Sequence, residues 1–308
     1  MTARVARLDP ALGVRVVGMR ELRYTAPAAS EDDRPPHVRA ASGLAFLGGK
    51  LAVIQDDAAF IATVARDEIG AIALPRGAGG RRRFEVGLGN KLEKLDLEAC
   101  VAVGDELWAF GSGSAPVRER IAVIGDATRV HEAAPLYRRV HEELGGAINL
   151  EGAAAVGGEL WLFHRGNTGP GDRGAAIVRL ECAALGRWLH GTGPLPELAG
   201  SSRFDLGSIG GVRLGFTDAA PAGGRVFYLA AAEASPNAID DGRVLGSQLG
   251  VIDGDGGRAA ALEHGGAPLK AEGLAFDPHD PRRAWIAIDP DDIDRPAALC
   301  ELELVGPW

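Results

Sequence analysis

Asn149–Phe163 reads NLEGAAAVGGELWLF, and the same phrase returns as DLEACVAVGDELWAF at Asp96–Phe110. Looser copies are ASGLAFLGGKLAVI from Ala41, FTDAAPAGGRVFYL from Phe216 and KAEGLAFDPHDPRRAWIAI from Lys270. Alignment of the copies, at separations of 56, 53, 67 and 54 residues, gives one equivalent position occupied by Ser42, Glu98, Glu151, Asp218 and Glu272. A period near 50 residues is typical of a propeller or solenoid array.

Each copy is predicted to form a strand, a tight turn and a second strand. In the first phrase these are Ile148 to Val156, Gly157-Gly158 and Leu160 to His164, and the glycines supply the positive φ angles of a short hairpin turn. Two further strand-like runs follow in most copies, here Ala175 to Leu180 and Arg187 to His190. Four strands per period correspond to one propeller blade.

The last copy, from Lys270, contains only three strand-like runs, whereas Val14 to Tyr24 is an unassigned strand ahead of the first copy. We expect this N-terminal strand to complete the last blade and close the ring, because closure removes exposed sheet edges. The sequence therefore predicts an all-β fold, a five-bladed β-propeller, as a single domain over residues 1–308. Six blades is the rival count, since the 67-residue separation and the segment Pro75 to Leu92 have room for extra strands.

The composition suits one compact protein and excludes some partners. With 308 residues, 46% of them hydrophobic, the chain can bury a large core. The net charge of −9 argues against nucleic acid as a partner. No apolar run is long enough to span a membrane, and charges interrupt Met1 to Gly18, so we expect no signal peptide, no membrane partner and a cytoplasmic location. The three cysteines show no metal-binding spacing.

The repeat alignment also predicts a site. The first strand of each blade lines the central channel, and side chains two residues apart face the same way. The carboxylates at the repeated position should then converge at one rim, together with the nearby Asp96. They belong to Glu98, Glu151, Asp218 and Glu272. Like charges this close need a counter-charge. Either a cation binds among them or Lys94, Arg165 and Lys270 neutralise them.

The loops that leave the second strands should join this rim. They contribute Gln55-Asp56-Asp57, His164, Arg165, Asn167 and Asp289. Oxygen ligands without cysteine favour calcium or magnesium over zinc. The alternative is structural: an acid repeated at the same point of successive blades accepts backbone N–H groups and locks one blade to the next.

Two segments carry a family resemblance. NLEGAAAVGGELWLFHRGN and KAEGLAF resemble the blade starts of the bacterial phytase-like, esterase-like propeller group, and especially an uncharacterised family within it. More distantly the chain is similar to the calcium-dependent gluconolactonase and senescence-marker propellers. That resemblance implies Glu151, Asn167 and Asp289 as ligands of a divalent ion. The acids Glu98 and Glu272 are additional here, the Glu-Gly-Pro blade start is missing, and no motif identifies a nucleophile.

The resulting hypothesis is a calcium-dependent hydrolase of a small ester, lactone or phosphoester. His164 or a carboxylate would move the proton, while Arg165 and Lys270 would hold an anionic group of a small-molecule substrate. The candidate metal ligands are Glu98, Glu151, Asn167, Asp218, Glu272 and Asp289. The alternative is a non-catalytic propeller that binds a small ligand, a peptide or a protein partner, at the same rim or on loops such as Arg76 to Lys91 and Ala134 to Gly145. The latter segment is predicted to be a short helix over the rim.

Overall fold

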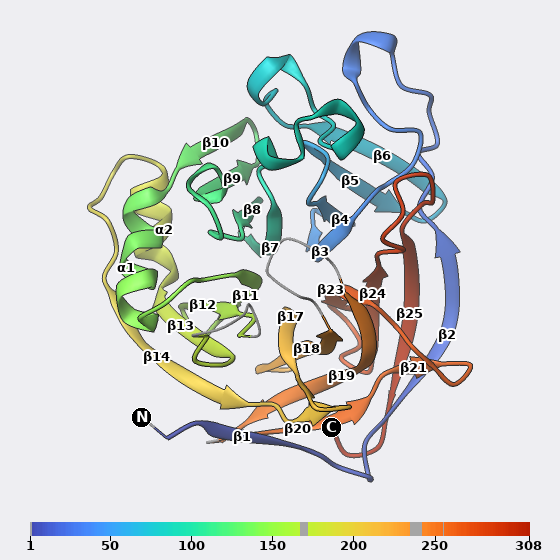
Figure 1. The fold of residues 1–308 in the computed structure, drawn as a ribbon, viewed down its shortest axis with the longest axis vertical. Helices are drawn as coiled ribbons and strands as arrows, with labels where there is room; N and C mark the ends of the chain where they lie inside the picture. Colours follow the sequence, from blue (N-terminus) through green and yellow to red (C-terminus); the bar gives the residue numbers. More distant parts are fainter. Residues whose placement is uncertain (1, 167–171, 235–241, 255) are drawn as a thin grey trace.

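The strands of this protein form sheets arranged like blades around a central axis (Figure 1). The computed structural model describes residues 2–166, 172–234, 242–254 and 256–308. Nearest the axis lie the strands β3 (Ala41–Leu47), β7 (Leu97–Val103), β11 (Leu150–Val156), β17 (Gly215–Ala222) and β23 (Ala271–Phe276). They contact one another in that cyclic order, and β23 contacts β3. The fold is therefore all-β and propeller-like.

Behind each of these inner strands the chain continues outward, mostly in antiparallel hairpins. The first sheet adds β4 (Lys50–Gln55), β5 (Phe60–Ala65) and β6 (Glu68–Ala73), and the second adds β8 (Glu106–Gly111), β9 (Arg120–Ile124) and β10 (Thr128–Glu132). The third adds β12 (Glu159–His164), β13 (Ala176–Glu181) and β14 (Leu198–Asp205), and the fourth adds β18 (Arg225–Ala234), β19 (Arg243–Asp253) and β20 (Gly256–Ala261). The last adds β24 (Arg283–Ile288) and β25 (Ala298–Val305). Two short hairpins, β15–β16 (Ser208–Ile209, Val212–Arg213) and β21–β22 (Glu263–His264, Ala267–Pro268), lie outside these sheets.

The N-terminal strand lies where the repeat pattern predicts it. β2 (Gly13–Glu21) pairs antiparallel with β25 and is the outermost strand of the last sheet. The two ends of the chain are thus joined by backbone hydrogen bonds within one sheet, which ties the ring together.

A second N-terminal strand, β1 (Arg4–Leu8), was not predicted. It pairs in parallel with β14 on one side and with β20 on the other, so that the third and fourth sheets become one nine-stranded sheet. Ala6, near its middle, is only 3% exposed. Because β1 covers the outer edges of two neighbouring sheets, it removes edges that would otherwise be free to pair with other chains.

Apolar side chains fill the spaces between neighbouring sheets. In the described part of the chain the buried hydrophobic residues form five clusters, and each cluster draws on two sheets that are adjacent in the ring. Such side chains belong to the alternating, inward-facing positions of each strand. The hydrophobic core is therefore distributed around the ring, between the sheets, rather than gathered at the central axis.

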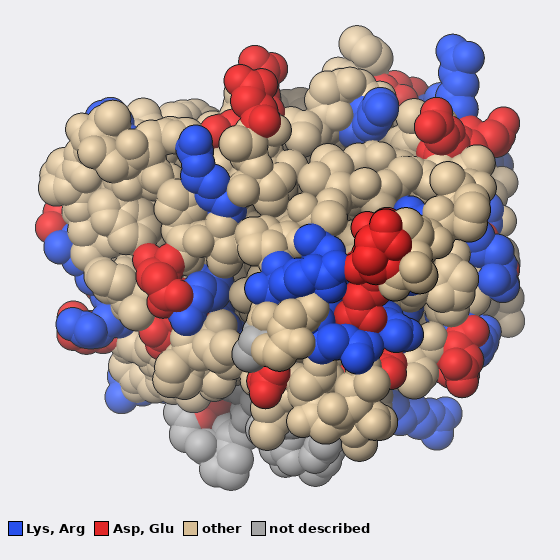
Figure 2. Space-filling view, turned by 90° about the horizontal axis from the view of Figure 1, so that it is seen from above, with Lys and Arg blue, Asp and Glu red and all other residues tan. Residues whose placement is uncertain are grey.

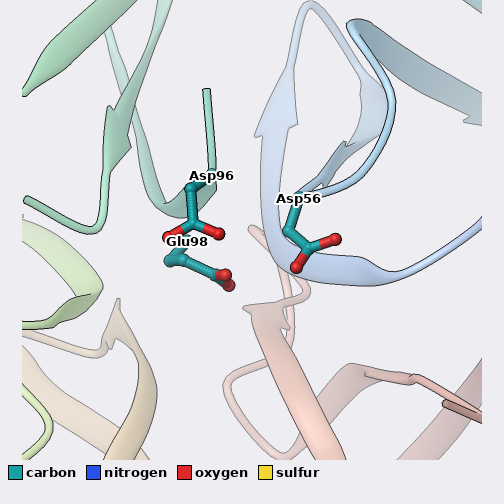
Figure 3. A group of neighbouring side chains, drawn as sticks. All are labelled: Asp56, Asp96 and Glu98. Carbon is teal, nitrogen blue, oxygen red and sulfur yellow. The ribbon is translucent and has the colours of Figure 1, made fainter. Parts of the chain in front are cut away.

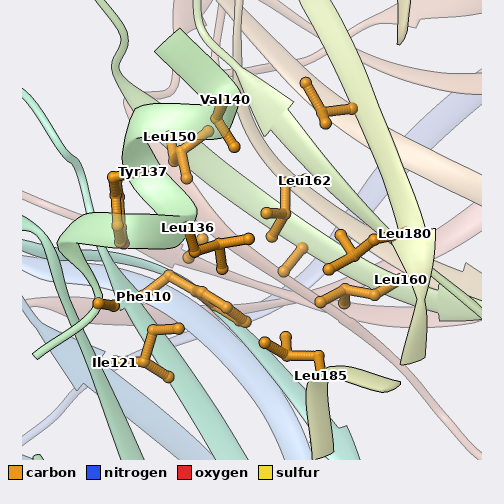
Figure 4. Packing of buried hydrophobic residues seen from close by; sticks show 14 of the residues in the cluster. Phe110, Ile121, Leu136, Tyr137, Val140, Leu150, Leu160, Leu162, Leu180 and Leu185 are labelled. Atoms are coloured by element: carbon orange, nitrogen blue, oxygen red, sulfur yellow. The ribbon is translucent and has the colours of Figure 1, made fainter. Parts of the chain in front are cut away.

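Helix α1 (Ala134–Leu144) confirms the short helix predicted over this segment. Pro135 lies in its first turn, and Gly145 ends it in the left-handed conformation with φ 65°. Its apolar face packs between the second and third sheets (Figure 4). The Tyr137 hydroxyl donates to the Gly111 carbonyl at 2.6 Å, so the helix is attached to the end of β8.

The predicted strand Arg187 to His190 is wrong. Those residues belong mainly to helix α2 (Cys182–Leu189), in which Leu185 and Leu189 are buried four residues apart, the spacing of a helix face. The fourth strand of that sheet is β14, further along the chain. Described residues of Pro75 to Leu92 form short 3₁₀ turns and no strand, including η2 (Ala78–Gly80) and η3 (Val86–Leu88).

The remaining features agree with the composition. All three cysteines are free, and Cys100 and Cys300 are buried. The helices within the described ranges are all too short or too polar to cross a membrane. Figure 2 shows acidic and basic side chains interspersed on one face of the molecule, without a broad surface of one sign.

Gly256→Val should destabilise the fold, because a Cβ atom at position 256 would lie 2.4 Å from the Val5 carbonyl oxygen and would push β1 off β20. We expect the free energy of unfolding to fall by about 1–3 kcal/mol, the usual cost of overpacking. Gly18→Ala, whose Cβ atom would meet nothing within 4 Å, is the matched control. Thermal and denaturant unfolding of both variants check this; equal stability of the two would show that β1 contributes nothing.

Candidate functional site

Every inner strand contains an irregularity at the same place. Its pairing with the following strand skips one residue, as a β-bulge does. The skipped residues are Ser42, Glu98, Glu151, Thr217 and Glu272. The repeat alignment was therefore one residue out in the fourth copy, because Thr217 and not Asp218 holds the equivalent position. A looser sequence match in that copy cannot reveal a one-residue slip, which only the strand register shows.

The fourth and first sheets use this region to hold their neighbours. Ser42 Oγ donates to the Leu97 carbonyl, and Thr217 Oγ1 donates to the Ala271 carbonyl at 2.7 Å. Asp218 is fully buried, and its carboxylate accepts the N–H groups of Ala219 and Leu274 at 2.7 and 2.6 Å. Burial raises the pKa of Asp218 well above its usual value although these bonds oppose the rise. Asp218 is thus a lock between sheets and does not line the central cavity described below.

The three glutamates behave differently. In the described part of the chain, no backbone N–H donates to the carboxylates of Glu98, Glu151 or Glu272. Glu151 is 4% exposed, and Arg165 Nη1 donates to both of its carboxylate oxygens, at 2.8 and 3.0 Å. Asn149 Nδ2 donates to the same carboxylate. Arg165 also donates to Glu233. The blade-lock interpretation therefore does not extend to these glutamates.

A polar cavity of about 310 Å³ opens at this end of the channel. Its acidic lining residues are Asp56, Asp57, Glu85, Asp96, Glu98, Glu151, Asp289, Asp291 and Asp292. Its basic lining residues are Arg39, Lys91, Lys94, Arg118 and Arg165. Carboxylates thus outnumber cations. Burial raises the pKa of Glu151 to about 7 against the opposing effect of Arg165, and burial together with Asp56 raises the pKa of Asp57 to about 6.

Three of the acids come together at the wall formed by the first two sheets (Figure 3). Oxygen atoms of Asp56, Asp96 and Glu98 lie within 4.8 Å of one another. Lys94 Nζ donates to Asp56 and lies 2.6 Å from Asp96. Arg118 Nη1 lies 3.0 Å from Asp96, which also accepts the Ser112 hydroxyl. Asp96 adopts a left-handed backbone with φ 55°, an uncommon conformation outside glycine.

The pKa values of two of these acids, Asp96 and Glu98, shift in opposite directions. Burial alone would raise the pKa of Asp96, but Lys94 and Arg118 hold it below its usual value. Glu98 has no hydrogen bond or ion pair to any residue that the structure describes. Burial, with Asp56 and Asp96 close by, raises its pKa well above the usual value. Glu98 is therefore a carboxyl group that faces the cavity and lacks a cation of its own.

A second group of acids surrounds Lys270. Lys270 pairs with Asp291 and lies 3.7 Å from both Glu272 and Asp289. Burial raises the pKa of Asp289 to about 7, although Lys270 opposes this, and burial also raises that of Glu272 well above its usual value. Asp289 lines the cavity, whereas Lys270 and Glu272 are not among its lining residues.

His164 lies outside the cavity lining. It is 2% exposed, its Nδ1 lies 3.0 Å from the Asn149 N–H, and its Nε2 lies 3.5 Å from Asp172. The Asn149 carbonyl oxygen also lies 3.2 Å from Nδ1, so both ring nitrogens face neighbouring polar groups of the protein. Asn167, the remaining predicted ligand, lies outside the described residues.

With this geometry established, comparison with known proteins places the chain. The sequence model of a family of unknown function, DUF6929, matches residues 37–304. The chain belongs to this family. No curated protein matches it.

Solved structures similar to this DUF6929 protein are distant. A glutaminyl cyclase from Myxococcus xanthus is 11% identical, with 100% of each chain covered and a TM-score of 0.49. The PQQ-bound aldose sugar dehydrogenase of Streptomyces coelicolor is 13% identical, with 96% of this chain and 99% of that chain covered and a TM-score of 0.42. A putative gluconolactonase is 9% identical, with 100% of each chain covered and a TM-score of 0.41. These values carry no activity over to the DUF6929 chain.

The site thus brings together part of the predicted set. Glu98, Glu151, Arg165 and Asp289 line one cavity in the DUF6929 protein, and Lys94, Arg165 and Lys270 each pair with the acids that they were expected to neutralise. The sequence marks Asp56 only as a loop residue after a strand, and its place in the group of three acids could not be predicted from the repeat. Sequence reasoning missed Arg39 and Arg118 altogether, because neither lies at a repeated position.

Asp218→Asn should weaken the fold, since an amide can accept only one of the two buried N–H groups that the carboxylate now accepts. We expect a loss of about 1–3 kcal/mol in the free energy of unfolding. Denaturant unfolding measures it, with Asp126→Asn, on an exposed turn, as the control. Unchanged stability would remove the role of Asp218 as a lock.

Asp289→Asn should alter how stability depends on pH. The folded pKa of about 7 lies above the ordinary value of 3.8, so the neutral form favours folding; this contribution is present below about pH 4 and is lost as the pH rises through about 7. The asparagine variant is neutral throughout. Its unfolding temperature minus that of the parent should therefore rise between about pH 4 and about pH 8 in chelator-treated protein. A constant difference would contradict the raised pKa.

Proposed function

We propose that this protein hydrolyses a small ester, lactone or phosphoester in the central cavity, with a divalent cation held by Asp56, Asp96 and Glu98. The observation that supports this most directly is Glu98, a carboxyl group without a hydrogen-bond or ion-pair partner in the described chain, next to two other carboxylates. A carboxylate in such surroundings favours a cation beside it, because otherwise it must take up a proton.

The oxygen atoms fit a cation of calcium's size. Calcium binds oxygen at about 2.3–2.6 Å, so ligand oxygens on opposite sides of it lie about 5 Å apart. The three carboxylates reach one another within 4.8 Å. Magnesium requires shorter bonds and a stricter octahedron, which makes calcium the better match. Lys94 now lies against two of the three ligands, and its ammonium group would have to move aside.

The protein's own residues would supply the other parts of the reaction. Arg118 and Arg165 line the cavity and can hold an anionic oxygen of the substrate. A carboxyl with a pKa near the working pH suits proton transfer, and Asp57 and Asp289 line the cavity with pKa values of about 6 and about 7. The cation, when bound, would polarise the substrate oxygen and make water a better nucleophile. His164 is less suited to this role, since it lies outside the cavity lining.

The proposed site also fits the number and arrangement of the blades. We infer five blades, because five inner strands contact one another in a closed cycle and five buried clusters separate the sheets in the described chain. In a propeller the inner strands surround a central channel, where small-molecule sites occur at one rim. The cavity volume of about 310 Å³ is at the small end of the usual range of about 300–1,000 Å³.

A second candidate is a propeller that binds a small ligand without catalysis. Ion pairs favour it: Lys94, Arg165 and Arg39 already neutralise Asp96, Glu151 and Asp57. A cavity that holds these ion pairs is preorganised to exchange one of them for a polar ligand. This candidate predicts binding of a ligand at the same rim but no turnover.

Calorimetric titration of chelator-stripped protein with calcium tests the cation. We expect saturable binding that releases protons, because the ion favours the charged form of Glu98. Glu98→Gln should weaken the affinity by at least about tenfold, since even residues behind metal ligands contribute about 10–100-fold. Glu85→Gln, which alters another acid of the same cavity, is the matched control. If the folded parent fails to bind calcium or magnesium, the proposed cation site is wrong.

Turnover of a panel of nitrophenyl esters, lactones and phosphoesters, with and without calcium, then separates the two candidate functions. Hydrolysis that Glu98→Gln reduces and Glu85→Gln keeps would support the enzyme. Calcium binding without turnover of any of these compounds would favour the binding protein.

A further inference from the structure

Large apolar side chains are exposed at the mouth of the cavity. Val86 is 77% exposed and Ile293 is 51% exposed, and both line the cavity. Leu92 is 67% exposed on the same segment as Val86 but does not line it. Most other cavity residues are charged, so the two apolar side chains stand out at its edge.

The backbone holds both side chains in place without burying them. Next to Val86, Phe84 is 2% exposed and its N–H donates to the Asp57 carbonyl at 2.9 Å. The Asn90 side chain accepts the Glu85 N–H at 3.0 Å and donates to the Arg83 carbonyl at 2.9 Å, which closes the turn that carries Val86. The Ile293 carbonyl lies 3.2 Å from His37 Nε2. Two apolar groups are thus fixed at the mouth, and each keeps much of its surface in water.

We propose that Val86 and Ile293 form an apolar lip that binds a short aliphatic or aromatic group of the substrate, whose polar end lies among Lys94, Glu98 and Arg118. The proposal rests on the proposed function and names its substrate class: an ester or phosphoester with an apolar substituent, rather than a fully polar compound such as a sugar phosphate.

Charge and size favour this occupant over a macromolecule. The polar floor of the cavity, which includes Lys94, Glu98 and Arg118, offers cations and a candidate metal site to an anionic or carbonyl oxygen. The apolar lip lines the same cavity of about 310 Å³. A ligand that uses both must be small and amphiphilic. Each methylene group that leaves water on the lip contributes about 0.8 kcal/mol, which corresponds to about fourfold in affinity.

The test is calorimetric titration of the calcium-loaded full chain with methyl-, butyl- and hexylphosphonate. These probes present the oxygen atoms of a phosphoester or of the tetrahedral intermediate of ester hydrolysis, and they differ only in apolar length. We expect the affinity to rise with chain length by about fourfold for each methylene group that leaves water on the lip. Val86→Ser and Ile293→Ser should each flatten the rise. Leu92→Ser, which changes an exposed apolar residue on the same segment as Val86 but outside the cavity lining, should keep it.

The outcomes separate the lip from the hydrolase. Affinity that rises with chain length supports the lip even if no ester is turned over, in which case only the catalytic part of the proposed function fails. Equal affinity for all three phosphonates overturns the lip while leaving the polar site intact, and would be the result if Val86 and Ile293 instead contact a protein partner. Absence of binding by any phosphonate overturns the proposed occupant as well.

Discussion

Carboxylates that leave water must find a cation or take up a proton, and the centre of this protein is built around that requirement. Three of the five inner strands place a glutamate at their bulge, so Glu98, Glu151 and Glu272 approach the same axis. Arg165 pairs with Glu151 and Lys270 lies beside Glu272, whereas Lys94 pairs with Asp96 and leaves Glu98 without an ion pair in the described chain. Asp96 makes this plain, since it stays ionised between Lys94 and Arg118, whereas Glu98 beside it has its pKa raised.

The same bulge serves two purposes, and the residue type decides which. A hydroxyl there, as in Ser42 or Thr217, is short enough to bond to a carbonyl group of the next sheet. A glutamate is longer and carries its charge past the backbone toward the channel. Asp218, one residue further on, receives the N–H of Leu274 and ties β17 to β23. Attachment of sheet to sheet and construction of the cavity are therefore assigned to different residues.

The cavity joins two kinds of surface. Its floor is densely charged, with a carboxyl group that lacks a partner in the described chain, and its mouth carries Val86 and Ile293 exposed to water. Charged floors bind polar reacting groups, and apolar rims bind the parts of a ligand that do not react. In a family of unknown function, this combination directs attention to small amphiphilic substrates.

Sequence alone determined the repeat and the all-β class, because hydrophobic alternation and glycine turns are local signals. The repeat in turn predicted the pairing of the N-terminal strand with the last sheet. It also predicted that Glu98, Glu151, Arg165 and Asp289 gather near one rim. It misplaced the fourth strand of the third sheet, where Leu185 and Leu189 follow a helical spacing. Tertiary structure decided the rest. The bulge register exchanged Asp218 for Thr217, β1 joined two sheets, and Arg39, Arg118 and Asp56 entered the cavity, since strand register and the pairing of distant charges depend on contacts between residues far apart in the chain.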